Sequence, residues 1–250
     1  MTFHDHFSPV SSPYAAFRPR YPAALFDWLA AAAPGHDLAW DCATGNGQAA
    51  LGLATRFRKV IATDASARQI AAATPDPRIE YRVAPADASG LTSASCDLVS
   101  VAQALHWFDL GKFWPEARRV LRPGGLLAVW LYVFTEFDHP PLDQLFHHFW
   151  SEVVGPYWPP ERALVNERYR SIALPFPELE TPHFAIEVDW TLAELLGYVG
   201  TWSAVHRYRT STGSDPVDAI APRFADLWGD DPTGKRHLRF PITLRAAKRP

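Results

Sequence analysis

The sequence has few cysteines, no long apolar run and little net charge, and each of these absences excludes a class of protein. Only Cys42 and Cys96 occur, without the spacing of a metal site, so neither a disulfide framework nor a bound metal is expected. The longest apolar run, 124–134, is too short to cross a bilayer, so no membrane partner is expected. A net charge of -3 gives no electrostatic reason to expect a nucleic acid as a partner.

A secretory signal consists of a basic stretch followed by an apolar run, and the N-terminus lacks this pattern. The expected compartment is therefore the cytoplasm. What is present is an ordinary globular composition, with 48% of the 250 residues apolar and 20% charged. We expect one domain over 1–250, as a monomer or a homodimer.

Strand-like and helix-like segments alternate through the first half of the chain. The strand-like segments are 38–41, 60–64, 79–84, 98–102 and 126–131. Helical patterns begin after Pro22 and Gly47, at Ser66, where Gln69 completes a capping-box pattern, and at Leu110. This alternation predicts an α/β fold with a doubly wound, mostly parallel sheet.

The pattern then changes. Prolines and aromatics crowd into 134–182, which predicts an irregular insertion that, together with 198–210, forms a substrate cap. A strand over 184–190, a helix after the capping box Thr191–Glu194 and a helix from Asp215 follow. A last strand over 238–246 would make the sheet seven-stranded, with an antiparallel C-terminal strand, and its Pro241 indicates an edge position or a bulge. The chain would then divide into an N-terminal lid and helix (1–33), a ligand-binding core (34–133), the cap insertion (134–182) and C-terminal strands and helices (183–250).

The most informative motif is Asp41-Cys-Ala-Thr-Gly45-Asn-Gly47-Gln48, between a strand and a helix. Glycines there let a ligand approach the backbone beyond the carboxyl ends of the strands. Asp64 ends the next strand, where a carboxylate binds ribose hydroxyls, and Asp87 follows the third strand, where it offers an acceptor to an adenine amino group.

Two ligands fit this motif. Gly45-x-Gly47-x-x-Ala50 satisfies the dinucleotide fingerprint, so an NAD(P)-dependent oxidoreductase is an alternative. Asp41, however, favours a cationic ligand over a pyrophosphate. A ligand with an ammonium, a sulfonium, a ribose and an adenine accounts for all three acids.

With further motifs, the chain resembles the class I S-adenosylmethionine-dependent methyltransferases of the methyltransferase-11 type, and among them a small-molecule group that includes trans-aconitate methyltransferases. The motifs are Tyr14-x-x-x-Arg18-Pro-x-Tyr21-Pro22, 41–48, Asp64-Ala-Ser, Ala86-Asp87, Ser95-Cys-Asp97, Gln103-Ala-Leu-His106-Trp107-Phe108-Asp109, Leu121-Arg-Pro-Gly-Gly125 and Thr201-Trp202-Ser203. The resemblance implies a Rossmann-like methyltransferase fold, S-adenosylmethionine as cofactor and O-methylation of a small organic acid or hydroxyl compound. A non-catalytic protein that binds S-adenosylmethionine is a second alternative.

The resemblance also implies a set of cofactor-binding residues. These are Tyr14, Arg18, Tyr21, Asp41, Ala43, Gly45, Gly47, Gln48, Asp64, Ala65, Ala86, Asp87 and Gln103. Asp41 and the loop would hold the methionine moiety, Asp64 the ribose and Asp87 the adenine, with Gln103 near the amino-acid end. Tyr14, Arg18 and Tyr21 would form a lid, in which Arg18 is a candidate partner for the cofactor carboxylate. Ala43 replaces the family's first glycine, and we expect its φ to be below zero.

His106 is the candidate catalytic residue. It follows the fourth strand, where it is expected to act as a general base or a hydrogen-bond donor, or only to fix the loop. The candidate substrate-binding residues are Trp107, Trp150, Trp158, Trp202 and Arg207, with Tyr157 and Arg209 as further cap residues. Arg207 and Arg209 would bind the carboxylate of an organic acid.

Overall fold

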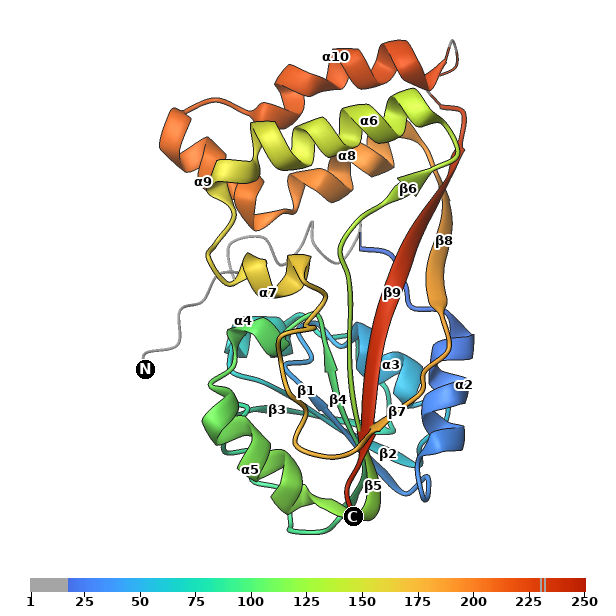
Figure 1. Cartoon of the computed structure of the whole chain (residues 1–250), viewed down its shortest axis with the longest axis vertical. Coiled ribbons are helices and arrows are strands. Elements are labelled where there is room, and N and C mark those ends of the chain that lie inside the picture. Colours follow the sequence, from blue (N-terminus) through green and yellow to red (C-terminus); the bar gives the residue numbers. More distant parts are fainter. Residues whose placement is uncertain (1–17, 230, 232) are drawn as a thin grey trace.

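The computed structural model describes residues 18–229, 231 and 233–250, so Tyr14 lies outside the described residues. Within them, one sheet of nine strands has the order β3-β2-β1-β4-β5-β9-β6, with β7 and β8 also paired to β9 (Figure 1). The strands are β1 (Leu38–Cys42), β2 (Lys59–Asp64), β3 (Ile79–Val83), β4 (Cys96–Ala102), β5 (Leu121–Tyr132), β6 (Glu136–Phe137), β7 (Glu178–Leu179), β8 (Phe184–Trp190) and β9 (Arg236–Lys248). Because β6 and β7 hold only two residues each, the longer strands are those of the predicted seven-stranded sheet.

The strands β1 to β5 are parallel, and β9 is antiparallel to both β5 and β8. The expected mostly parallel sheet with an antiparallel C-terminal strand is confirmed. Successive residues of a strand point to opposite faces of the sheet. Accordingly, Ala39 and Leu126 belong to one buried core, and their neighbours Trp40 and Leu127 belong to another.

Helices cover both faces and one end of the sheet. They are α2 (Ala23–Ala32), α3 (Gln48–Leu53), α4 (Ala67–Ala71), α5 (Leu110–Val120), α6 (Pro140–His148), α7 (Arg162–Asn166), α8 (Leu192–Gly200), α9 (Ser203–Thr212) and α10 (Pro216–Trp228), with short turns η2 (Leu105–Trp107), η3 (Phe149–Val153) and η4 (Gly155–Tyr157). Residues of α2 and α3 pack into the first core, and residues of α5 pack into the second. The sheet is therefore covered on both faces, as the alternating sequence pattern predicts.

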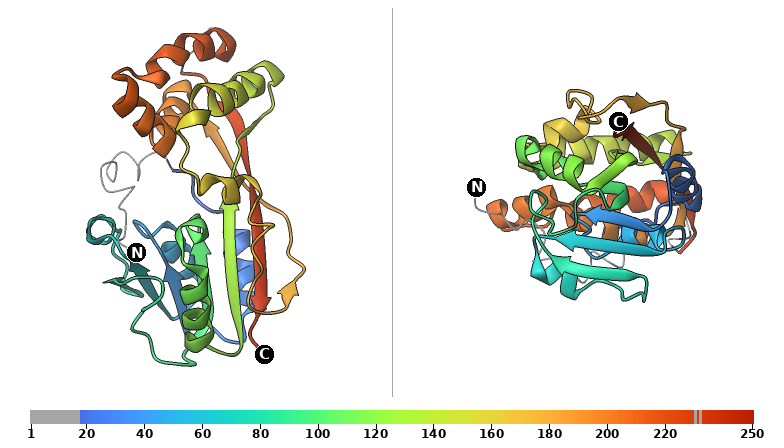
Figure 2. Two further views of the ribbon diagram at one scale, coloured as in Figure 1. Left: turned by 60° about the vertical axis from the view of Figure 1, so that its left-hand side comes forward. Right: turned by 90° about the horizontal axis from the view of Figure 1, so that it is seen from below.

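A second layer of helices stands at one end of the sheet. Figure 1 shows α6, α8, α9 and α10 stacked at this end, with α7 between them and the sheet, and the left view of Figure 2 shows the same arrangement. We call α6, η3, η4, α8, α9 and α10 the upper layer. Their buried side chains continue the first core, from Leu145 in α6 to Phe224 in α10.

The upper layer differs from the predicted cap insertion over 134–182. Only the first part of that segment, through η4, joins the upper layer, and α8 to α10 supply the rest of it. The second part turns back along the sheet. There Val165, Tyr169, Ile172 and Phe176 pack into the second core, and β7 pairs with the end of β9. The apolar side chains of 164–176 thus pack against the sheet. The sequence did not indicate this packing, because the apolar residues of the segment have no regular period.

Strand β9 runs through both layers. It pairs with β5 and then β6 along one side, and with β7 and then β8 along the other. Its expected edge position is therefore wrong, and on the β8 side Pro241 pairs with Ala185 without a shift in register. Between the pairs Tyr132–Ile242 and Glu136–Arg239 the register shifts by one residue, and Pro241 lies in this interruption.

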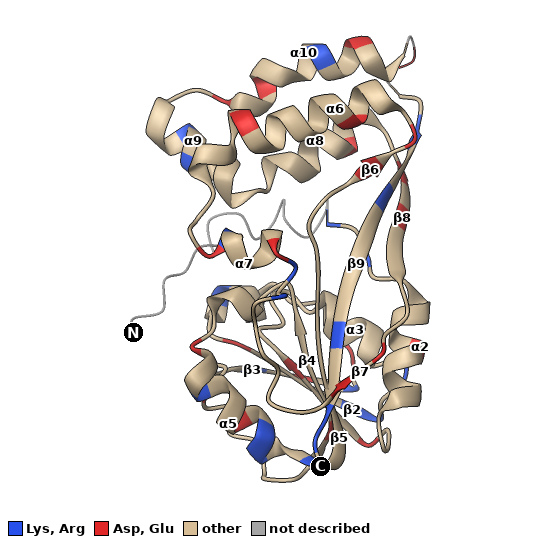
Figure 3. Cartoon of the chain, in the orientation of Figure 1, with Lys and Arg blue, Asp and Glu red and all other residues tan. Residues whose placement is uncertain are grey.

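Local capping follows the sequence. Thr191 and Glu194 form the full capping box of α8, and the Asp215 side chain accepts a hydrogen bond from the Val217 amide at the start of α10. At α4 the Ser66 side chain accepts from the Gln69 amide. Basic and acidic residues are interspersed over the elements coloured in Figure 3. Among the residues described, no helix has the length and apolar character needed to cross a membrane, and no cluster of His, Cys, Asp and Glu could hold a metal ion.

Candidate active site at the carboxyl ends of the strands

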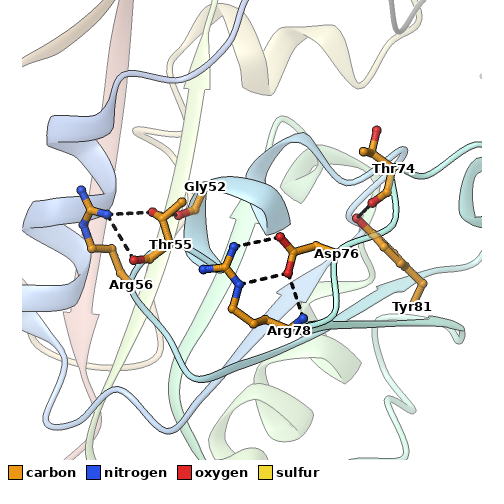
Figure 4. Close-up of polar contacts among 7 residues, drawn as sticks. All are labelled: Gly52, Thr55, Arg56, Thr74, Asp76, Arg78 and Tyr81. Atoms are coloured by element: carbon orange, nitrogen blue, oxygen red, sulfur yellow. Dashed lines mark hydrogen bonds and ion pairs between the residues drawn. The ribbon is translucent and has the colours of Figure 1, made fainter.

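The glycine loop between β1 and α3 has a left-handed backbone at both glycines. Gly45 has a φ of 58° and Gly47 a φ of 91°. A Cβ at Gly47 would lie 2.3 Å from the Tyr81 hydroxyl, whereas one at Gly45 would have no neighbour closer than 4.0 Å. Figure 4 shows Tyr81 directed at Thr74, whose carbonyl accepts its hydroxyl proton at 2.9 Å. Tyr81 thus fills the space that a side chain at position 47 would need, whereas the space beside Gly45 is open.

Ala43 corrects one expectation. Its φ is +55°, not below zero, so alanine adopts here the conformation that the family's glycine would take without strain. Gln103, which follows the adjacent strand β4, has a φ of +58°. A left-handed conformation costs a non-glycine residue about 1–2 kcal/mol. Such strained residues cluster at functional sites, and these two lie at the ends of neighbouring strands.

Asp41 supports the loop from inside. Its side chain is fully buried, and its two carboxylate oxygens accept hydrogen bonds from the Thr44 hydroxyl at 2.5 Å and the Ser100 hydroxyl at 2.8 Å. Burial raises the pKa of this carboxyl to about 6. The hydrogen bonds from the two hydroxyls act in the opposite direction and lower the pKa, but by less. The sequence did not indicate that Asp41 ties β1 to β4.

The other two acids lie nearer the surface. Asp64, at the end of β2, accepts hydrogen bonds from the Gly45 amide at 2.9 Å and the Ser66 amide at 2.8 Å. Asp87 is exposed, and none of the described residues binds its carboxylate. The remaining predicted cofactor residues Gln48, Ala65 and Ala86 are partly exposed at the same end of the sheet.

A polar cluster surrounds the ends of β4 and β5. The Gln103 side-chain amide donates to the Tyr132 carbonyl at 3.2 Å. Arg18 donates to the Tyr132 hydroxyl at 3.1 Å and lies 5.6 Å from the centre of the Tyr198 ring. Tyr21 packs edge-on against the Trp130 ring at 5.6 Å. Arg18 and Gln103 are thus brought together through Tyr132, whereas Tyr21 is packed against the core.

His106 lies beside this cluster. Its Nδ1 forms a hydrogen bond of 2.8 Å with the Tyr169 hydroxyl, and its ring lies 4.7 Å from that of Trp107. Burial and, to a lesser extent, the charge of Arg162 lower the pKa of His106 to about 3. The imidazole is therefore neutral at pH 7 and a weak base, which disfavours the expected general-base role. The roles of a substrate hydrogen-bond donor and of a residue that fixes the loop, here through Tyr169, stay open.

Three of the predicted substrate residues come together above this edge. Trp158 donates its indole N–H to the Trp150 carbonyl at 3.3 Å, and its ring lies 5.5 Å from that of Trp202. Arg162 lies over the Trp158 ring, with its guanidinium carbon 4.1 Å from the ring centre.

The arginines predicted to bind a carboxylate are not part of this group. Arg209 forms an ion pair with Asp215 at 2.7 Å and donates to the Gly200 carbonyl at 3.3 Å, so its guanidinium is already engaged within the upper layer. Arg207 lies on α9 in the upper layer, and no contact among the described residues joins it to His106 or Arg162. Sequence reasoning named Arg207 and Arg209 because they follow Trp202. It missed Arg162, which lies in a segment without periodicity.

Comparisons with known proteins decide between the two ligands that fit the glycine loop. A family model described as a methyltransferase domain matches residues 40–129. A protein of Dictyostelium discoideum named as a methyltransferase is 32% identical over 252 residues, which cover 99% of this chain and 96% of that protein. A solved structure from Anaeromyxobacter dehalogenans, described as a type II methyltransferase, has a TM-score of 0.87 at 46% identity, covering 93% of this chain and 98% of that one.

The chain belongs to the methyltransferase family. This methyltransferase is an enzyme that depends on S-adenosylmethionine, and its sheet has the Rossmann-like arrangement of the family. A Haloferax volcanii methyltransferase, solved in complex with the activator Trm112, shares the fold at 18% identity and a TM-score of 0.54. The NAD(P)-dependent oxidoreductase, which the dinucleotide fingerprint left open, is overturned by these relatives.

Proposed function

We propose that this methyltransferase methylates an oxygen atom of a small organic molecule, an organic acid in preference to a hydroxyl compound. The observation that carries the proposal is the meeting of two groups at one sheet edge. The glycine loop and its acids lie at the ends of β1 to β3, and the cluster of Gln103, Tyr132 and Arg18 lies at the ends of β4 and β5. Because β1 and β4 are neighbours, a cofactor on the loop would contact the cluster with its amino-acid end, and the acceptor would lie beside it.

The residues of the loop fit S-adenosylmethionine. The open side of Gly45 lets a ligand approach the backbone, where the Cβ of a larger residue would project. Asp64 would bind the ribose hydroxyls and Asp87 the adenine amino group, while Gln103 and Arg18 would hold the amino-acid end. Asp41, buried behind Thr44, would act on the cofactor through the loop that it supports.

S-adenosylmethionine supplies a methyl group on a sulfonium centre, which is already activated. The protein therefore has to position the acceptor and exclude water. Trp107, Trp150, Trp158 and Trp202 would provide an apolar wall for this purpose. A hydroxyl compound needs a base to remove its proton, and His106 is a weak base. A carboxylate is a nucleophile at pH 7 without proton removal, so an organic acid is the better acceptor.

A thermal unfolding experiment tests the cofactor assignment. A ligand that binds only the folded state raises the melting temperature, by an amount set by its concentration and its dissociation constant. S-adenosylhomocysteine is expected to raise it, and NAD and NADP are expected to leave it unchanged. A shift with NAD and none with S-adenosylhomocysteine would falsify the proposal. A screen of organic acids and phenols for release of S-adenosylhomocysteine then tests the acceptor class.

A further inference from the structure

The loop that joins β3 to β4 contains no helix or strand over 84–95, and hydrogen bonds to other elements hold it. At its start, its first amide donates to the Asp64 carbonyl at 3.0 Å, which ties the loop to the end of β2. Further on, Ser89 donates to one side-chain oxygen of Glu116 in α5, through its amide at 2.9 Å and through its hydroxyl at 2.5 Å. Asp87 lies between these two anchors.

Glu116 is a charged residue on the buried face of α5. The other buried residues of this helix are Phe113, Ala117 and Val120, which share one helical stripe with it. Glu116 is 8% exposed, and Arg119 donates to its two oxygens at 2.7 and 2.8 Å. These hydrogen bonds lower the pKa of Glu116 to about 2, so its carboxylate is ionised at pH 7. Apolar residues often stabilise such a position as well as a buried ion pair does, so packing alone does not account for Glu116.

Both members of this ion pair bind the loop. Arg119 also donates to the Ser93 hydroxyl at 3.0 Å, near the end of the loop. The hydroxyl of Ser89, besides donating to Glu116, accepts a hydrogen bond from the Leu91 amide at 3.2 Å. Ser89 and Leu91 are 2% and 5% exposed, so this part of the loop is buried against α5. Glu116 therefore holds the loop at a point two residues beyond the exposed Asp87.

We infer that Glu116 is a positioning residue for the cofactor, which holds Ser89 and thereby fixes Asp87 relative to Asp64. This inference rests on the proposed function, in which Asp64 binds the ribose and Asp87 the adenine amino group. Ribose and adenine are joined by one bond, so the two carboxylates have to be held at a set separation. Because Asp87 is exposed, the position of its carboxylate depends on the backbone that carries it. A hydrogen bond weakens steeply when its donor and acceptor are misaligned, so a shift of the loop would weaken the bond to adenine.

The test measures recognition of the adenine amino group separately from the stability of the protein. Titration calorimetry on the full chain compares S-adenosylhomocysteine with its 6-deamino analogue, in which a hydrogen atom replaces the amino group. The analogue keeps the ribose and the amino-acid end but has no donor for Asp87. The selectivity is the dissociation constant of the analogue divided by that of S-adenosylhomocysteine. A melting curve of each variant reports its stability.

Two variants loosen the anchor. Glu116→Met keeps the length of the side chain and removes both oxygens, and Ser89→Ala removes the hydroxyl. Asp87→Ala, alone and combined with Glu116→Met, shows whether the effect passes through Asp87. Asp97→Asn is the matched control, because Asp97 is also a buried carboxylate that accepts two backbone amides and pairs with Arg122 at 2.9 Å. It lies at the other end of the sheet, near the start of β4.

The wild type should show a selectivity of roughly 10- to 100-fold, the value of a hydrogen bond to a charged acceptor, and Asp87→Ala should show almost none. Glu116→Met should lose most of the selectivity, a fall of roughly 5- to 50-fold, and Ser89→Ala should lose part of it. The double variant should match Asp87→Ala, since a residue that acts through Asp87 has no effect once that carboxylate is absent. Asp97→Asn should lower the melting temperature and keep the selectivity of the wild type.

The outcomes separate this inference from the proposed function. If S-adenosylhomocysteine does not bind the wild type, the proposed function fails. If it binds but the wild type shows no selectivity, or Asp87→Ala keeps it, the adenine role of Asp87 and the inference both fail, and the cofactor assignment stands.

Unchanged selectivity in Glu116→Met would overturn the inference alone. So would an equal loss in Asp97→Asn, because the effect would then be one of general stability. If Glu116→Met does not fold, Ser89→Ala decides, and unchanged selectivity in that variant would contradict an anchor at Ser89.

Discussion

Replacing Ala43 by glycine should stabilise the enzyme. Ala43 stands in the glycine loop with a φ of +55°, a region that a residue with a Cβ occupies at a cost of about 1–2 kcal/mol. Glycine removes this cost. It also gives the unfolded chain more freedom, which lowers stability by about 0.4–1 kcal/mol. The expected net gain in the free energy of unfolding is therefore about 0.5–1 kcal/mol, the difference between the two terms.

For a chain of this size, that gain corresponds to a rise in melting temperature of about 1–4 °C. The assay is urea unfolding followed by circular dichroism, with a melting curve by differential scanning fluorimetry. Ala94→Gly is the matched control, because Ala94 has a φ of +51° but is exposed and lies outside the glycine loop. Both variants should gain stability by similar amounts.

The comparison of the two variants identifies where the reasoning would fail. If Ala94→Gly gains stability and Ala43→Gly loses it, the methyl group of Ala43 makes contacts that outweigh its backbone strain. If neither variant gains stability, the left-handed conformation at these positions carries no measurable cost. Either result would refute the expected net gain from Ala43→Gly.

Two further predictions concern the acids beneath and beside the loop. Burial raises the pKa of Asp41 from 3.8 to about 6, so between these pH values the folded state binds a proton that the unfolded state has lost. The free energy of unfolding should therefore fall by up to about 3 kcal/mol as the pH rises from 4 to 6. Asp41→Asn should flatten this part of the profile in urea titrations, and an unchanged slope would contradict the assignment. Asp64→Ala should weaken binding of S-adenosylhomocysteine by roughly 10- to 100-fold in titration calorimetry. It should also lower the melting temperature, because it removes the acceptor of the Gly45 amide. Undiminished affinity in the folded variant would rule out a contact with the ribose.

The arrangement of the sheet could be predicted from the sequence because it depends on periodic patterns. The strand over 184–190 has the predicted bounds, and the capping box of α8 forms as its residues indicate. These features depend on neighbours in the chain. By contrast, the edge position predicted from Pro241 is wrong. Proline is tolerated in this internal strand because the pairing on one side of it is interrupted at that residue.

The candidate site was only partly predictable, for two physical reasons. The sign of φ at Ala43 is set by how the loop packs, and an alanine in the sequence argues for the opposite sign. Arg162 and Tyr169 belong to a segment whose side chains approach the site only after the chain turns back over the sheet. No pattern in the neighbouring sequence indicates such a contact. The glycine loop, Asp64 and Gln103 were recognisable because they lie at the ends of strands or directly after them.

The length of β9 has a mechanical consequence. A single hydrogen-bonded strand joins the sheet to the upper layer, so the two layers cannot swing apart like domains on a flexible linker. Opening would have to bend a pleated ribbon that is paired on both sides. Pairing on the β5 and β6 side is interrupted at Pro241, so we expect any bending to occur there. Relative movement of the layers should therefore be a small twist about that residue, and exchange of acceptor and product should depend on the smaller segments around the site.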